Sequence, residues 1–152
     1  VAYTFMNLGA FAVVIALAQP DGERVTIDDY AGLGLKYPFL GAAMALFMFS
    51  LAGIPPTGGF MGKFYIFSAA IQANYFGLAI IGVLNSVISV YYYLRITVVM
   101  YMSQGEAESP AGGLSPALAL AVLIAILGTL QLGLFPSRFL EVALRSVGAL
   151  LS

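Results

Sequence analysis

The chain has 152 residues, of which 61% are hydrophobic and only 9% are charged, and its net charge is −1. Soluble domains carry roughly a quarter of charged residues, so this chain has too little charge to cover a water-facing surface and belongs in a bilayer. A net charge of −1 without a basic cluster argues against a nucleic acid partner. The absence of Cys and His argues against haem, iron–sulfur and ordinary zinc sites, and against His-based catalytic triads.

The first predicted membrane span covers residues 1–18, which carry no charge and are just long enough to cross the hydrocarbon core. The span starts at Val1 as if in the middle of a helix, without a basic region or a clear cleavage site, so no signal peptide is predicted. We expect a fragment of a longer membrane protein. Residues 19–37 hold many of the charges and are predicted to form an aqueous loop.

The second predicted span is residues 38–73, interrupted at 54–59. Its apolar pieces, 38–53 and 60–73, are each short for a span but together exceed the hydrocarbon core. One interrupted, tilted helix is the simplest interpretation. A re-entrant hairpin is the alternative, and it would change the topology by one crossing.

Two further spans are predicted at 76–102 and 114–135, with a short acidic turn between them at 103–113. The charges of 138–151 recur at spacings of three and four, which predicts an amphipathic helix on the membrane surface. The predicted fold is therefore all-α, a polytopic transmembrane bundle in one membrane domain. Lys and Arg are too evenly distributed to predict its orientation.

The interruption contains Pro55 and Pro56, which lack backbone donors and clash with a preceding helical turn, and Gly58 and Gly59, which permit unusual backbone conformations. Broken helices recur at the ion sites of transporters. A plain kink or a surface loop is the alternative. Lys63 follows the interruption and is the only charge between Lys36 and Arg95.

An ammonium inside apolar sequence is costly and often marks a path for ions or protons. A buried lysine can exchange a proton near neutral pH, whereas arginine stays charged. Lys63 is therefore the candidate proton relay, and a lysine that snorkels to the headgroups is the alternative. Supporting polar candidates are Thr57, Tyr65, Asn85, Ser86 and Ser89, of which the last three lie at helical spacing and serve either a water chain or helix–helix contacts. No metal-ligand spacing or phosphate-binding loop is visible.

Residues 51–65 (LAGIPPTGGFMGKFY) and 89–95 (SVYYYLR) resemble the antiporter-like subunits of respiratory complex I, and most closely the N-type subunits of bacterial NADH:quinone oxidoreductase. Residues 3–11 fit the same family. The resemblance covers 1–102 and implies the C-terminal third of such a subunit. It also implies that the lysine of the Gly-Lys-Phe run, here Lys63, belongs to the proton pathway of a broken helix.

The resemblance further implies a proton-translocating subunit of an enzyme complex in the bacterial inner membrane, with other membrane subunits and lipid as partners and quinone at the level of the complex. No cofactor is expected in this chain, because flavin and iron–sulfur clusters would lie in partner subunits. M-type subunits carry a glutamate at the position of Lys63, but multisubunit sodium/proton antiporters can carry Gly-Lys. Two alternatives therefore stay open: a cation/proton antiporter subunit and a purely structural membrane scaffold.

Overall fold

The computed structural model describes residues 1–18, 26–103, 114–137 and 141, and these residues contain helices and turns but no strand. The elements are α1 (Ala2–Ala16), the 3₁₀ turn η1 (Ile27–Tyr30), α2 (Leu33–Lys36), α3 (Pro38–Ala52), α4 (Gly58–Gln72), α5 (Phe76–Met102) and α6 (Pro116–Leu134). The predicted all-α class is confirmed for the part of the chain described.

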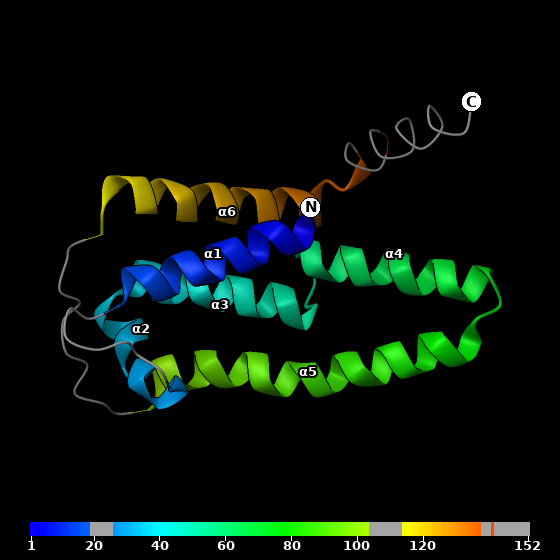
Figure 1. Cartoon of the computed structure of the whole chain (residues 1–152), viewed down its shortest axis with the longest axis horizontal. Helices are drawn as coiled ribbons and strands as arrows, with labels where there is room; N and C mark the ends of the chain where they lie inside the picture. Colours follow the sequence, from blue (N-terminus) through cyan, green and yellow to red (C-terminus); the bar gives the residue numbers. More distant parts are fainter. Residues whose placement is uncertain (19–25, 104–113, 138–140, 142–152) are drawn as a thin grey trace.

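Figure 1 shows α1, α3 and α6 side by side, with α1 packed against both of the others. α4 and the long helix α5 form a hairpin, and α5 then continues along α3. α4 continues in the same general direction as α3 instead of folding back along it. α3 and α4 are therefore arranged as one interrupted helix and not as a re-entrant hairpin.

The interruption is shorter than its prediction at 54–59. α3 ends at Ala52, and α4 begins at Gly58. Gly58 and Gly59 are thus buried helical residues rather than part of the break. Each half-helix has 15 residues, about 22 Å at the usual helical rise, so neither alone crosses a hydrocarbon core of about 30 Å.

The other bounds lie close to their predictions. α5 covers the predicted 76–102, and α6 lies inside the predicted 114–135. α5 and α6 are long and apolar enough to cross a membrane, whereas α1 and α3 are apolar but shorter. The predicted surface helix at 138–151 lies outside the described residues, apart from Glu141.

Glycines under aromatic rings set the distances between helices. A Cβ atom on Gly128 of α6 would lie 2.7 Å from the Phe5 ring of α1, and one on Gly82 of α5 would lie 2.6 Å from the Phe67 ring of α4. A Cβ on Gly9 would collide with the ring of Phe47, which is fully buried. Small residues of this kind let helices in membranes approach closely.

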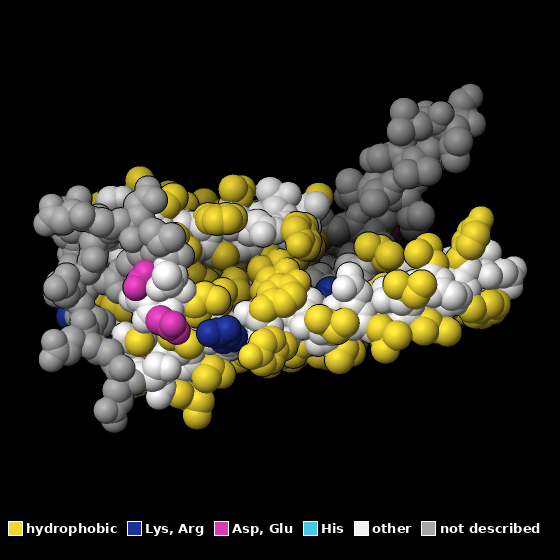
Figure 2. Space-filling view, turned by 60° about the horizontal axis from the view of Figure 1, so that its bottom comes forward, with side chains coloured by type: hydrophobic (Ala, Val, Ile, Leu, Met, Phe, Trp, Pro, Cys, Tyr) yellow, Lys and Arg dark blue, Asp and Glu magenta, His cyan; other side chains and the backbone are white. Residues whose placement is uncertain are grey.

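The outer surface is apolar. Figure 2 shows hydrophobic side chains over most of the described face in view, with the few charged ones mainly toward one end. On α5, Ile81 and Ile88 are 66% and 67% exposed. A contiguous apolar surface of this extent marks contact with lipid or with other protein, as expected for a transmembrane bundle.

Gly59→Ala is expected to destabilise the protein, because the added methyl group would collide with the carbonyl oxygen of Ser50. The expected loss is about 1–3 kcal/mol in the free energy of unfolding, as for other overpacked sites. Denaturation of the purified protein in mixed micelles measures it. The matched control is Gly62→Ala on the same helix, where a Cβ meets nothing within 4 Å. Equal stabilities of the two variants would contradict the assigned packing.

Candidate functional site

The C-terminal end of α3 is closed by a glycine turn. Gly53 has φ 89° and ψ 40°, a left-handed conformation that glycine adopts without penalty. Its N–H donates to the Ser50 carbonyl, and the N–H of Ile54 donates to the Phe49 carbonyl, both at 3.0 Å. This pattern is a Schellman motif, which leaves the carbonyls of Leu51 and Ala52 to find other partners.

The two prolines explain why those carbonyls lack helical partners. In an α-helix each carbonyl accepts from the N–H four residues later, which for Leu51 and Ala52 would be residues 55 and 56. Pro55 and Pro56 occupy these positions and have no N–H to donate. The sequence therefore removes both donors at once, and neighbouring groups must satisfy the carbonyls where water is absent.

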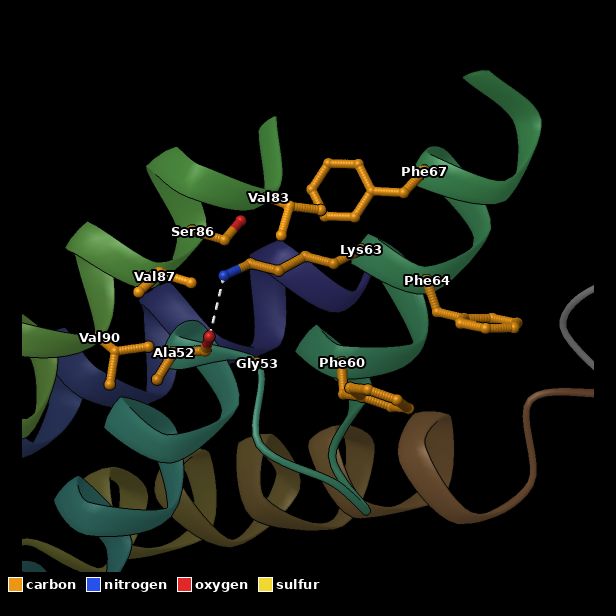
Figure 3. A pocket seen from close by; sticks show the side chains of 10 residues that line it. All are labelled: Ala52, Gly53, Phe60, Lys63, Phe64, Phe67, Val83, Ser86, Val87 and Val90. Carbon is orange, nitrogen blue, oxygen red and sulfur yellow. Dashed lines mark hydrogen bonds between the residues drawn. The ribbon is translucent and has the colours of Figure 1, made fainter. Parts of the chain in front are cut away.

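Lys63 supplies the missing donors. Its Nζ atom donates to the Leu51 and the Ala52 carbonyl oxygens, each at 3.0 Å. Figure 3 shows the side chain reaching from α4 across to the end of α3. The carbonyl end of a helix carries a partial negative charge that favours a cation. One ammonium therefore replaces two backbone N–H groups and ties the half-helices together.

Lys63 also borders two cavities. One, of about 320 Å³, lies toward α5 and is lined by Ala52, Gly53, Ser86 and apolar side chains of α4 and α5. The other, of about 460 Å³, lies toward α1 and includes Tyr3 and Ser50 in its lining. Each has room for several water molecules, since one occupies roughly 30 Å³ in the liquid. Lys63 thus borders a hydratable space on two sides.

The other predicted site residues lie in different places. Ser86 lines the cavity toward α5 with Lys63, and Ser89 donates to the Ser86 carbonyl at 2.6 Å. Thr57 is buried in the break, where its hydroxyl donates to the Ile54 carbonyl at 2.7 Å. Asn85 and Tyr65 are exposed, and neither lines the two cavities.

The structure adds residues that the sequence prediction missed. Ser50 of α3 is fully buried and contacts both α1 and α4 through its hydroxyl. Gly133 of α6 packs so closely on the break that an added Cβ would collide with the Pro56 carbonyl. Counting four residues back from the prolines would have identified the carbonyls of Leu51 and Ala52. No comparable sequence signal marks Ser50 or Gly133.

The chain is similar to proteins of one family. Residues 1–89 match the family described as NADH:quinone oxidoreductase/Mrp antiporter, transmembrane region. The chain is 53% identical over 145 residues to the NADH-quinone oxidoreductase subunit N of Trichlorobacter lovleyi, covering 95% of this chain and 30% of that protein. It is 49% identical over 149 residues to subunit N 1 of Solibacter usitatus, covering 97% and 31%.

A solved structure gives the same result for the fold. A chain of respiratory complex I from Thermus thermophilus, solved with bound aureothin, superposes with a TM-score of 0.71 at 32% identity, covering 89% of this chain and 32% of that one. The chain thus spans about 30% of the length of the relatives that it matches.

Lys63→Met is expected to destabilise the protein, because it leaves the Leu51 and Ala52 carbonyls without their donor. The expected cost is about 1–3 kcal/mol in the free energy of unfolding, measured by denaturation in mixed micelles. Lys63→Arg retains N–H donors and is expected to keep most of the stability. Arg95→Met, which removes an exposed cation from α5, is the control. A loss no greater than that of Arg95→Met would argue against the capping role.

Proposed function

The chain belongs to the NADH:quinone oxidoreductase/Mrp antiporter transmembrane family, and from that membership we propose that it is part of a proton-translocating membrane subunit of an NADH:quinone oxidoreductase. The names of the relatives, all NADH-quinone oxidoreductase subunit N, support this choice within the family. The place of action is the bacterial inner membrane. In this proposal Lys63 is the residue of the chain that takes up and releases the proton.

The observation that carries the proposal is that the Lys63 amine bonds the end of a broken helix while Lys63 lines two cavities. A proton relay needs a group that can gain and lose a proton and that contacts water on both sides of the transfer. Lysine meets the first requirement, unlike arginine. The cavities toward α1 and α5 meet the second when they are hydrated.

In the proposed cycle, the Lys63 ammonium passes a proton to water in one cavity and takes a proton from water in the other. Two N–H groups stay on the Leu51 and Ala52 carbonyls, so a single position on the nitrogen exchanges the proton. The amine must release one carbonyl and turn to present that position to the other cavity. Ser86 is placed to hydrogen-bond water in the cavity toward α5. Thr57 supports the relay indirectly, by its bond within the break.

Redox chemistry belongs to other subunits in this proposal. The chain has no Cys or His with which to hold an iron–sulfur cluster or haem, so we place flavin and iron–sulfur clusters in partner subunits. Electron transfer to quinone elsewhere in the complex would change the hydration and charge around the break. The membrane subunits that adjoin this chain, together with lipid, would cover its apolar surface.

Two other functions make different predictions. A cation/proton antiporter subunit is the alternative consistent with the family description, which includes Mrp antiporters. It predicts sodium-dependent transport by the isolated subunit. A membrane scaffold predicts that Lys63 affects assembly and not transport. The identity of about 50% to subunit N relatives favours the redox-linked pump over both.

Lys63→Arg is expected to abolish or strongly reduce proton pumping while NADH oxidation by the complex continues, because arginine can cap α3 but cannot release a proton. The variant is made in the full-length subunit, and the complete complex is reconstituted in liposomes. Proton uptake and NADH oxidation are recorded together. Lys63→Met is the companion variant, and Arg95→Lys is the control for a cation exchange elsewhere. Normal pumping by both Lys63 variants in assembled complexes would refute the relay.

A further inference from the structure

A second polar link between the half-helices lies one helical turn from Lys63. The hydroxyl of Ser50, on α3, donates to Met6 Sδ of α1 at 2.7 Å and accepts from the Gly59 N–H of α4 at 3.1 Å. Ser50 is fully buried, and Met6 is 2% exposed. One hydroxyl thus joins three helices inside the bundle.

α4 depends on this hydroxyl for its N-terminal cap. The first N–H groups of a helix have no carbonyl partner within it, and the side chain before the helix usually accepts from one of them. The residue in that place, Thr57, forms no such bond, and its hydroxyl donates to the Ile54 carbonyl instead. Ser50 therefore supplies, from another helix, the acceptor that Thr57 does not.

The location of this cap determines where the Lys63 amine can lie. Ser50 directly precedes Leu51 and Ala52, whose carbonyls hold the ammonium, and Gly59 lies one turn before Lys63 on α4. The backbone of Gly59 also packs directly on the Ser50 carbonyl. The lysine stem is flexible, so its Nζ atom stays on the Leu51 and Ala52 carbonyls only while α4 keeps its register against the end of α3.

We propose that Ser50 is the positioning residue of this site: through the Gly59 N–H it sets the register of α4 against α3 that places the Lys63 amine on the Leu51 and Ala52 carbonyls. The inference rests on the proposed function of Lys63 for its effect on transport. Its structural part, the position of the amine, does not depend on that function.

The test is Ser50→Ala in the full-length subunit of the complete complex, reconstituted in liposomes. The number of protons pumped per NADH oxidised is expected to fall, because displacing a reacting group by about 1 Å can slow a reaction about a hundredfold, and the pH profile of pumping is expected to shift. Ser50→Cys keeps a weaker donor and acceptor at the same place and is expected to fall between wild type and Ser50→Ala. It also serves as the test variant if Ser50→Ala does not assemble.

Two controls separate positioning from general damage. Ser68→Ala removes a half-buried hydroxyl from α4 outside both cavities and is expected to pump normally. Met44→Leu repacks a buried methionine of α3 that lines neither cavity and is expected to retain most of the pumping. Met44→Leu as harmful as Ser50→Ala would place the effect in core packing and overturn the proposal.

Two further measurements decide how Ser50 acts. In a double-mutant cycle of the free energy of unfolding, Ser50→Ala and Lys63→Met are expected to be coupled, because Ser50 acts by placing the amine; fully additive losses would overturn the proposal. An electron cryomicroscopy structure of the Ser50→Ala or Ser50→Cys complex is expected to show the Lys63 amine displaced from at least one carbonyl, and an unmoved amine would also overturn it. If Lys63→Met pumps normally, the relay fails, and this structural comparison still decides the positioning role.

Discussion

The site depends on one constraint: two backbone carbonyls in an apolar setting must be satisfied after two consecutive prolines remove their donors. Leu51 and Ala52 meet this constraint through a side chain on the next helix. In a bilayer, a carbonyl without a donor is costly, so the break and the lysine form a unit. Pro55 and Pro56 without Lys63 would leave two bare acceptors, and Lys63 without the prolines would lose its binding place.

The rest of the fold keeps the two half-helices where Lys63 of α4 can donate to the carbonyls at the end of α3. α6 presses on the break through Gly133, and α5 supports α4 where the Phe67 ring covers Gly82. The half-helices are apolar on nearly all sides in sequence, so their hydrophobic pattern alone does not determine which side is buried. Close contacts at small residues and a few buried hydrogen bonds therefore determine their register, as is usual where lipid removes the hydrophobic drive between helices.

Hydrophobic runs, proline and charge were sufficient to predict the helices and to select Lys63, which lies beside the break and bonds the end of α3, because these signals lie in adjacent residues. The bounds of α5 and the interruption after α3 follow from them. Gly58 and Gly59 were placed in the break, since glycine permits irregular backbone, but the structure uses them for close approach inside α4. Ser50 was not predicted, because a lone serine in an apolar helix has many uses, and its partners Met6 and Gly59 come together only in the folded bundle.

The bonds from Lys63 to α3 have a mechanical consequence. As an ammonium, the side chain makes charge-assisted hydrogen bonds to both carbonyls, and such bonds are roughly twice as strong as neutral ones. As an amine, it can still donate to both, but more weakly. The joint between α3 and α4 is therefore stiff when Lys63 is charged and soft when it is neutral. Any partner that bends this joint changes the proton affinity of Lys63 in return, by thermodynamic reciprocity.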